Sequence, residues 1–196
     1  MVTGNLTTPP YQIIGSTVES LASNSGYVLL RETSFSASAT IQVTDVFGIT
    51  NSQIFSDYLI MINCTSSVVN QYIQISFLQN TTVMGAGTYT NAGAWFYYGS
   101  GVTGSWSSTN ASGCFIGYVA APSTTNPTIG SMIVRNPLVS GIDTTTEQIF
   151  DMGGAYLGWG ASRYPATNVI NGFQITQQGG GNLTGNVSVF GMRTLF

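Results

Sequence analysis

The carboxylates are the groups of this sequence best suited to acid–base chemistry, because the chain has no histidine and no lysine. Without histidine the most common general base is missing, and neither a Ser-His-Asp triad nor a Cys-His pair can form. The segment GIDTTTEQIFDMGG carries three acids spaced four residues apart, Asp143, Glu147 and Asp151. A glycosidase would need two of them about 5–9.5 Å apart. The strand-like sequence around them predicts acids on either side of a turn, so we expect a solvated loop and no enzyme.

Metal and cofactor sites also lack their usual residues. The two cysteines, Cys64 and Cys114, cannot complete a zinc site without histidine, and seven scattered acids do not favour a calcium site. The glycine-rich segment GGGNLTG (residues 179–185) is not followed by Lys-Ser/Thr, so it indicates a hairpin turn and not a phosphate-binding loop. We expect no cofactor and no metal. Each cysteine lies in an apolar, strand-like run, which predicts buried thiols; a disulfide formed outside a reducing cell is the alternative.

Aromatic side chains offer a route to ligand binding without charge. Sugars stack on exposed rings through their C–H faces, while Asn and Asp supply hydrogen bonds; the alternative is that the rings fill the core. In a strand, Trp95 and Tyr97 face one side and their neighbours in the run WFYY face the other. Trp106 is the strongest candidate, because the polar stretch around it supplies no core face. The candidate glycan or partner contacts are Trp106, Trp95, Tyr97 and Trp159.

The charge content narrows the range of partners. Charged residues make up 6% of the 196 residues, where about 25% is usual, and the net charge is −3. Four arginines give no electrostatic footprint for nucleic acid or for an anionic membrane. No segment approaches the roughly 18 consecutive apolar residues that span a bilayer. A surface of Ser, Thr, Asn, Gln and Gly repels other copies weakly, which suits a protein that stands in a fixed array.

The order of apolar and polar residues predicts an all-β protein. Ile73, Ile75 and Phe77 alternate with polar residues, as expected of a strand with one buried face, and Gly, Ser, Asn and Thr clusters separate such runs. Many short strands with turn signals between them indicate an antiparallel β-sandwich of the jelly-roll kind. We expect strands at residues 27–33, 39–43, 58–65, 72–78, 94–98, 114–121, 131–136, 147–150, 156–159, 169–177 and 187–194.

The first 26 residues differ from the rest and predict an extended docking arm that precedes a sandwich domain of residues 27–196. Two adjacent prolines favour an extended path, and the apolar residues after them could form one or two helical turns. Candidate docking residues are Pro9, Pro10, Tyr11, Ile13 and Ile14. The N-terminus has neither a positive region nor a continuous apolar stretch, so we expect synthesis in a cytoplasm without signal-dependent export.

Two stretches resemble the β-sandwich modules at the ends of bacteriophage tail fibres. The first is GYVLLRETSFSASATIQVTDVF followed by YLIMINCTSS, and the second is INGFQITQQGGGNLTGNVSVFGMR. Together they cover roughly residues 27–78 and 169–193, and their motifs are structural, not catalytic. The resemblance implies a jelly-roll-like sandwich, commonly trimeric, on a virion surface. Tail fibres place such modules behind a long shaft, whereas this chain has only the predicted arm.

A module without a shaft must sit directly on the particle. We therefore expect a structural protein of a phage particle, a homotrimer made in the host cytoplasm and docked on the virion surface as capsid decoration or cement. Its expected partners are copies of itself and the major capsid or tail protein. The alternative is a short tail-fibre or receptor-binding protein that recognises a host surface glycan.

Overall fold

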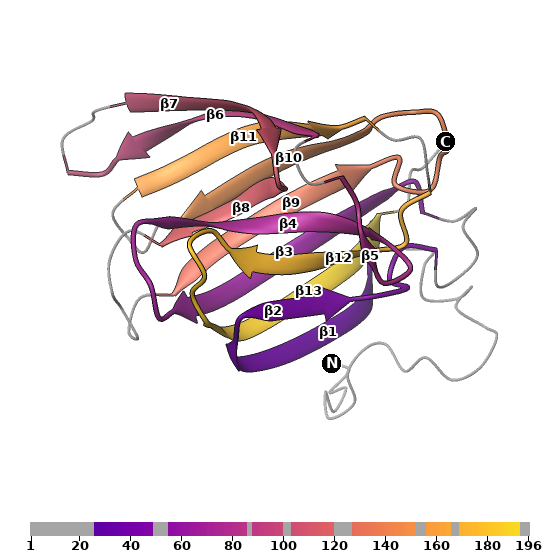
Figure 1. Ribbon diagram of the computed structural model, residues 1–196, viewed down its shortest axis with the longest axis horizontal. Helices are drawn as coiled ribbons and strands as arrows, with labels where there is room; N and C mark the ends of the chain where they lie inside the picture. Colours follow the sequence, from indigo (N-terminus) through magenta and orange to yellow (C-terminus); the bar gives the residue numbers. More distant parts are fainter. Residues whose placement is uncertain are drawn as a thin grey trace, which may run out of the picture.

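The computed structural model describes residues 26–48, 55–85, 88–99, 103–119, 127–151, 156–165 and 169–192, and these form two antiparallel sheets packed as a β-sandwich (Figure 1). No described residue lies in a helix, so the described part of the chain has no helix able to cross a membrane. In spatial order, the large sheet contains β1 (Tyr27–Ser38), β13 (Leu183–Met192), β3 (Asp57–Ser66), β9 (Thr128–Arg135), β10 (Thr144–Asp151), β11 (Tyr156–Tyr164), β6 (Tyr89–Tyr97) and β7 (Thr103–Ala111). The small sheet contains β2 (Thr40–Val43), β12 (Gly172–Gln177), β4 (Gln71–Gln79), β5 (Thr82–Val83) and β8 (Cys114–Val119).

The strand pairing is that of a jelly roll. Four antiparallel pairs match the early strands with the late ones in reverse order: β1 with β13, β2 with β12, β3 with β9 and β4 with β8. Pairing of β13 with β3 and of β12 with β4 then rolls this long hairpin into two facing sheets. The resulting orders, β1-β13-β3-β9 and β2-β12-β4-β8, confirm the fold expected from the sequence.

Two insertions extend the large sheet beyond this jelly roll. The segment between β4 and β8 contributes β6 and β7, and the segment between β9 and β12 contributes β10 and β11. These four strands join at the β9 edge in the order β10-β11-β6-β7, and β6 and β7 lie at one margin of the molecule (Figure 1). We call them the four-strand extension. All three tryptophans of the chain lie on it, Trp95 on β6, Trp106 on β7 and Trp159 on β11.

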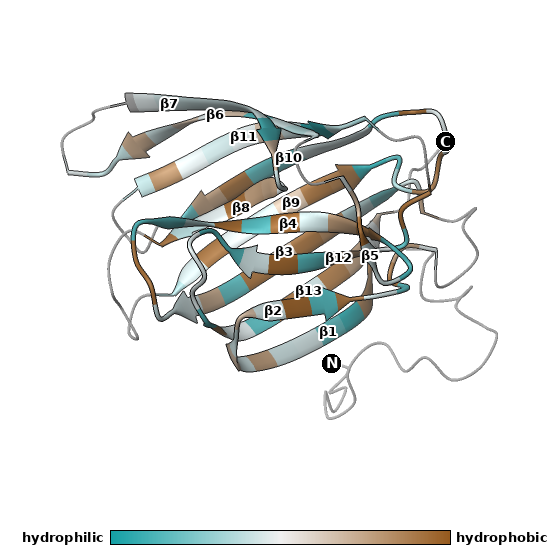
Figure 2. Cartoon of the chain, viewed as in Figure 1, coloured by the Kyte–Doolittle hydropathy of each residue, from teal (hydrophilic) through white to brown (hydrophobic). Residues whose placement is uncertain are grey.

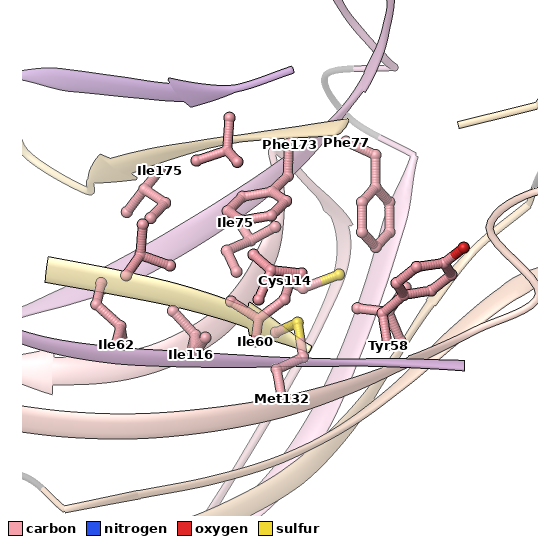
Figure 3. Packing of buried hydrophobic residues seen from close by; sticks show 14 of the residues in the cluster. Tyr58, Ile60, Ile62, Ile75, Phe77, Cys114, Ile116, Met132, Phe173 and Ile175 are labelled. Atoms are coloured by element: carbon pink, nitrogen blue, oxygen red, sulfur yellow. The ribbon is translucent and has the colours of Figure 1, made fainter. Parts of the chain in front are cut away.

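Alternating apolar residues of the two sheets fill the space between them. Figure 2 shows this alternation along the strands, and Figure 3 shows side chains of β3, β4, β8, β9 and β12 meeting in the core. On β3, Tyr58, Ile60 and Ile62 are buried. Each fully buried aliphatic side chain contributes about 1.5–3 kcal/mol, so this layer dominates the stability of the fold. Cys64 and Cys114 are both buried free thiols, as the sequence predicted.

The turn at residues 178–182 differs from the expected hairpin. It connects β12 in the small sheet with β13 in the large sheet, so the two strands do not pair with each other. Gly179 and Gly180 both have positive φ, at 83° and 85°, and glycine tolerates this conformation without a steric cost. The glycine-rich segment thus lets the chain cross from one sheet to the other. The predicted arm and its candidate residues Pro9 to Ile14 lie outside the described residues.

Candidate binding site

The inner face of the four-strand extension is built around two reciprocal tryptophan–glycine pairs. In the register of β6 and β7, Trp106 lies opposite Gly93 and Trp95 lies opposite Gly104. Each glycine leaves room above its backbone, and the indole of the partner strand occupies it: the Trp106 ring lies against Gly93 and the Trp95 ring against Gly104. The two indoles stack with their centroids 5.7 Å apart and their planes 19° apart. The absence of a side chain at Gly93 and at Gly104 therefore determines the position of both tryptophans.

Aromatic contacts continue from Trp106 to the small sheet. Its ring centroid lies 5.8 Å from that of the buried Phe150 and 6.4 Å from that of Tyr72 on β4. Tyr72 in turn stacks on Phe115 at 4.3 Å and meets Tyr118 edge-on at 4.9 Å. At the other side of the extension, the Tyr97 and Tyr156 rings lie 4.9 Å apart.

These tyrosines influence one another electrostatically. Burial raises the pKa of Tyr118, and the nearby Tyr156 phenol raises it further. Burial likewise raises the pKa of Tyr72, with Tyr118 as the second cause. The hydroxyls of Tyr72 and Tyr118 therefore stay protonated and neutral at physiological pH. The Nε1 atom of Trp106 is buried and has no hydrogen-bond acceptor among the described residues.

A buried polar network holds the extension in place beneath the Trp106 ring. Ser162 donates to Asn91 Oδ1 at 2.5 Å and accepts from Gln148 Nε2 at 3.1 Å. Thr146 donates to Gln148 Oε1 at 3.1 Å. Asn91 Nδ2 donates to the carbonyl oxygen of Gly113 at 3.0 Å, in the turn by which the chain passes from β7 to β8. The network thus ties β6, β10 and β11 to the crossing between the sheets.

The outer face of the large sheet carries an exposed apolar surface. The register places Met61, Ser131, Ile149 and Trp159 in one row across β3, β9, β10 and β11. Trp159 stacks on Phe96 with ring centroids 4.6 Å apart, and both rings are exposed. We call the exposed large apolar residues at the centre of this face the apolar band; they are Met61, Phe96, Ile129, Ile149 and Trp159.

Charged residues lie beside the apolar band and pair within the chain. Arg135 bonds Glu147 at 2.8 Å and lies 4.0 Å from Asp57, while Arg163 pairs with Asp143. The hydrogen bond from Arg135 lowers the pKa of Glu147, whereas burial raises that of Asp57 against the opposing charge of Arg135. A shallow depression of about 290 Å³ lies between the two arginines, and its lining includes the small residues Ala92 and Ala161.

The structure separates the candidate residues of the sequence onto two faces. Trp95 and Tyr97 share the inner face, as strand alternation predicted, and Trp159 lies on the outer face. Trp106 is the strongest candidate from the sequence because its polar neighbours supply no core face, yet it is half-buried, since Gly93, Phe150 and Tyr72 of other strands pack against it.

The sequence predicted that the three acids lie on either side of a turn, and this prediction is wrong. Glu147 and Asp151 lie on the same strand, β10, four residues apart, so their backbones are about 13 Å apart. Asp143 precedes the strand and pairs with Arg163. The described residues contain no group of three or more metal-binding side chains.

Several residues of the inner face carried no decisive signal in the sequence. Tyr72 and Tyr118 alternate with core residues and resemble ordinary strand positions in the sequence; only their cross-strand pairing brings them together.

Comparison with known proteins gave no match to a family model, to a curated protein or to a solved structure.

Proposed function

We propose that this protein is a structural component of a phage particle, in which copies associate through the apolar band of the large sheet. The observation that carries the proposal is the exposure of large apolar side chains in adjacent rows of five neighbouring strands, with Ile149 58% exposed at the centre. In a jelly roll that acts as a monomer, this outer face would be polar, since only the inner face faces a core.

The size of the band fits an interface. Five strands at a spacing of about 4.8 Å span about 20 Å, and the two rows lie about 7 Å apart along the strands, which gives on the order of 200 Å² when the width of the side chains is included. A standard interface buries about 800 Å² per partner, so the band alone is smaller than a whole interface. The band would therefore form the core of an interface whose rim is the surrounding polar surface.

The charges support a second copy of the chain as the occupant. Of the charged side chains on this face, Asp57, Arg135 and Glu147 are paired with one another and Arg163 is paired with Asp143, while Asp151 lies opposite Ile129 of the band. Copies of the chain can approach through this face without strong repulsion when its charges are already compensated. We propose a cyclic trimer, in which the face of each copy contacts both neighbours around one threefold axis.

Attachment to the particle is the remaining part of the proposal. We place the trimer on the virion surface as capsid decoration or cement, with the predicted arm at residues 1–26 as the docking segment and the major capsid or tail protein as the partner. The resemblance of residues 27–78 and 169–193 to tail-fibre modules supports a phage origin. A receptor-binding role is the second candidate, and the aromatic inner face of the extension favours it.

The assembly is tested by Ile149→Lys, which places a charge at the centre of the band without touching the core. Light scattering coupled to size-exclusion chromatography should show a trimer for the parent chain and a folded monomer for the variant. Val83→Lys is the matched control, because Val83 is also an exposed apolar strand residue but lies on the small sheet. A parent chain that is monomeric, or an Ile149→Lys variant that assembles normally, would contradict the proposal.

Attachment is tested separately by deleting residues 1–26. The shortened protein should keep the circular dichroism of a folded sandwich but fail to bind particles in a co-sedimentation assay. Normal occupancy of the particle by the shortened protein would rule out the arm as the docking segment. Electron microscopy of the intact particle would distinguish a capsid position from a tail position.

A further inference from the structure

We propose that the inner face of the four-strand extension is a binding site for a neutral oligosaccharide. The site is an arc of six side chains, which we call the aromatic arc: Trp95, Tyr97, Tyr156, Tyr118, Tyr72 and Trp106. The proposal does not rest on the assembly described above, because the apolar band lies on the opposite face of the same strands.

The arc is continuous from the large sheet to the small one. The Trp95 and Trp106 rings stack, and Trp106 approaches Tyr72, which meets Tyr118 edge-on. Tyr118 is close enough to Tyr156 for the two phenols to interact electrostatically, and Tyr156 packs on Tyr97. Trp95 and Tyr97, two residues apart on β6, close the arc at its outer side.

The arc is partly open to solvent, unlike the tyrosines of the core. Tyr58 and Tyr89 are fully buried, and both phenol oxygens are bonded to the backbone: Gly48 N–H donates to Tyr58, and Phe77 N–H donates to Tyr89. The arc residues are half-buried or, for Tyr97, 38% exposed. Burying them in the sandwich would have been the ordinary use of such rings, so their partial exposure indicates a binding surface.

The chemistry of the arc selects a neutral sugar chain. Every side chain in it is uncharged, so it lacks the arginines and lysines that phosphate, sulfate or nucleic acid would require. Flat indole and phenol faces fit the C–H faces of pyranose rings, and four phenol hydroxyls can donate and accept hydrogen bonds with sugar hydroxyls. The two indoles pack against Gly93 and Gly104 of the neighbouring strands and are therefore preorganised, which reduces the entropy lost on binding.

The test uses the full-length protein with three neutral probes, cellohexaose, chitohexaose and maltohexaose, at concentrations up to about 10 mM. Binding is followed by isothermal titration calorimetry and by tryptophan fluorescence, which should respond because two of the three tryptophans lie in the arc. The variant Tyr97→Ala removes an exposed arc ring at little risk to the fold. Tyr27→Ala is the matched control: Tyr27 is also an exposed aromatic strand residue, but it lies on β1, at the edge of the large sheet opposite the extension.

At least one probe should bind the parent chain, and Tyr97→Ala should weaken that binding about fivefold, while Tyr27→Ala should bind as the parent does. Tyr97→Phe keeps the ring and should lose less affinity than Tyr97→Ala. Absence of binding by all three probes, an unchanged affinity in Tyr97→Ala, or an equal loss in Tyr27→Ala would overturn the proposal. The oligomeric state of each variant, measured in parallel, separates this outcome from a failure of the assembly model.

Discussion

Trp95 and Trp106 stack on each other because each lies directly opposite a glycine of the neighbouring strand. The pairs Trp95–Gly104 and Trp106–Gly93 are reciprocal, so the two indoles lie diagonally across the β6–β7 hairpin with centroids 5.7 Å apart. A strand that carries glycine normally loses stability, because glycine has no side chain to pack. Here the partner's indole covers the glycine, so that the weak position becomes the support of an aromatic surface.

Adding a side chain at Gly93, where the Trp106 ring now lies, should destabilise the hairpin of β6 and β7. A Cβ atom at Gly93 would collide with the Trp106 ring and with the backbone oxygen of Trp159, and the backbone cannot move aside easily. Gly93→Ala should therefore lower the free energy of unfolding by about 1–3 kcal/mol, measured by urea denaturation. Gly26→Ala is the control, because nothing lies within 4 Å of its added carbon, and it should change stability little. Equal stabilities of the two variants would contradict the role of Gly93.

Removing the amide of Asn91 should loosen the extension as a unit. This buried side chain accepts a hydrogen bond from the Ser162 hydroxyl and donates one to the Gly113 carbonyl oxygen. Asn91→Ala leaves the buried Ser162 hydroxyl without this acceptor and the Gly113 carbonyl oxygen without this donor, at about 1–3 kcal/mol for each group left unsatisfied. We expect a clear loss of stability and faster amide hydrogen exchange in β6 and β7 than in β3. Thr90→Ala, the exposed neighbour on the opposite face, should leave both measurements unchanged.

The fold could be predicted from the sequence to a large extent, because the alternation of apolar and polar residues along a strand indicates which of its faces is buried. The segment around Tyr58 buries every second residue, whereas the one around Ile75 is buried on both faces, and the expected strands there agree with β3 and β4 to within one residue at each end. The edge strand β7 was missed because its sequence, TGSWSSTNA, offers one large apolar residue. Such a strand owes its conformation to pairing with β6, which no local pattern can indicate.

The candidate site was only partly predictable for the same reason. Strand alternation placed Trp95 and Tyr97 on a common face, but the position of Trp106 depends on Phe150 and Tyr72, which are remote in sequence. The apolar band was not anticipated, since Ile149 and Met61 become neighbouring surface residues only through the pairing of β10 and β3 with β9. Register between distant strands is set by the whole fold, so a single sequence reveals which residues can face together but not which do.

The two cysteines should be chemically silent in the folded protein. Burial raises the pKa of both thiols to about 12, and the thiolate is the reactive form. A thiol reagent such as dithionitrobenzoate at about pH 8 should label neither cysteine in native protein and both in denaturant. Rapid native labelling would contradict this burial.

Replacement by serine should distinguish the two thiols. Burial alone raises the pKa of Cys64, whereas at Cys114 hydrogen bonding to the Ser162 and Thr146 side chains partly opposes the larger effect of burial. A serine hydroxyl at position 114 thus finds partners, while one at position 64 does not, so Cys64→Ser should cost about 1–3 kcal/mol and Cys114→Ser less. Urea denaturation of the two variants measures the difference, and the reverse order would show that the polar neighbours do not compensate the hydroxyl.

The ion pair of Arg135 and Glu147 should make a small, pH-dependent contribution to stability. Because the hydrogen bond from Arg135 lowers the pKa of Glu147 in the folded state, the contribution is present above the ordinary value of 4.5 and is lost as the pH falls through the folded value. Glu147 is 60% exposed, so solvent screening limits the effect to about 0.5 kcal/mol at low salt. Glu147→Gln should therefore be slightly less stable than the parent at pH 7 and equal to it near pH 3.

A double-mutant cycle isolates this pair from its neighbour Asp57, whose pKa burial raises and whose effect on stability has the opposite dependence on pH. Asp57 is present in the parent and in Glu147→Gln, so most of its effect cancels in the comparison. In an Arg135→Gln background, Glu147→Gln should change stability little at either pH, because the partner that lowers the pKa is gone. If the effect of Glu147→Gln persists in that background, its cause lies outside the pair with Arg135.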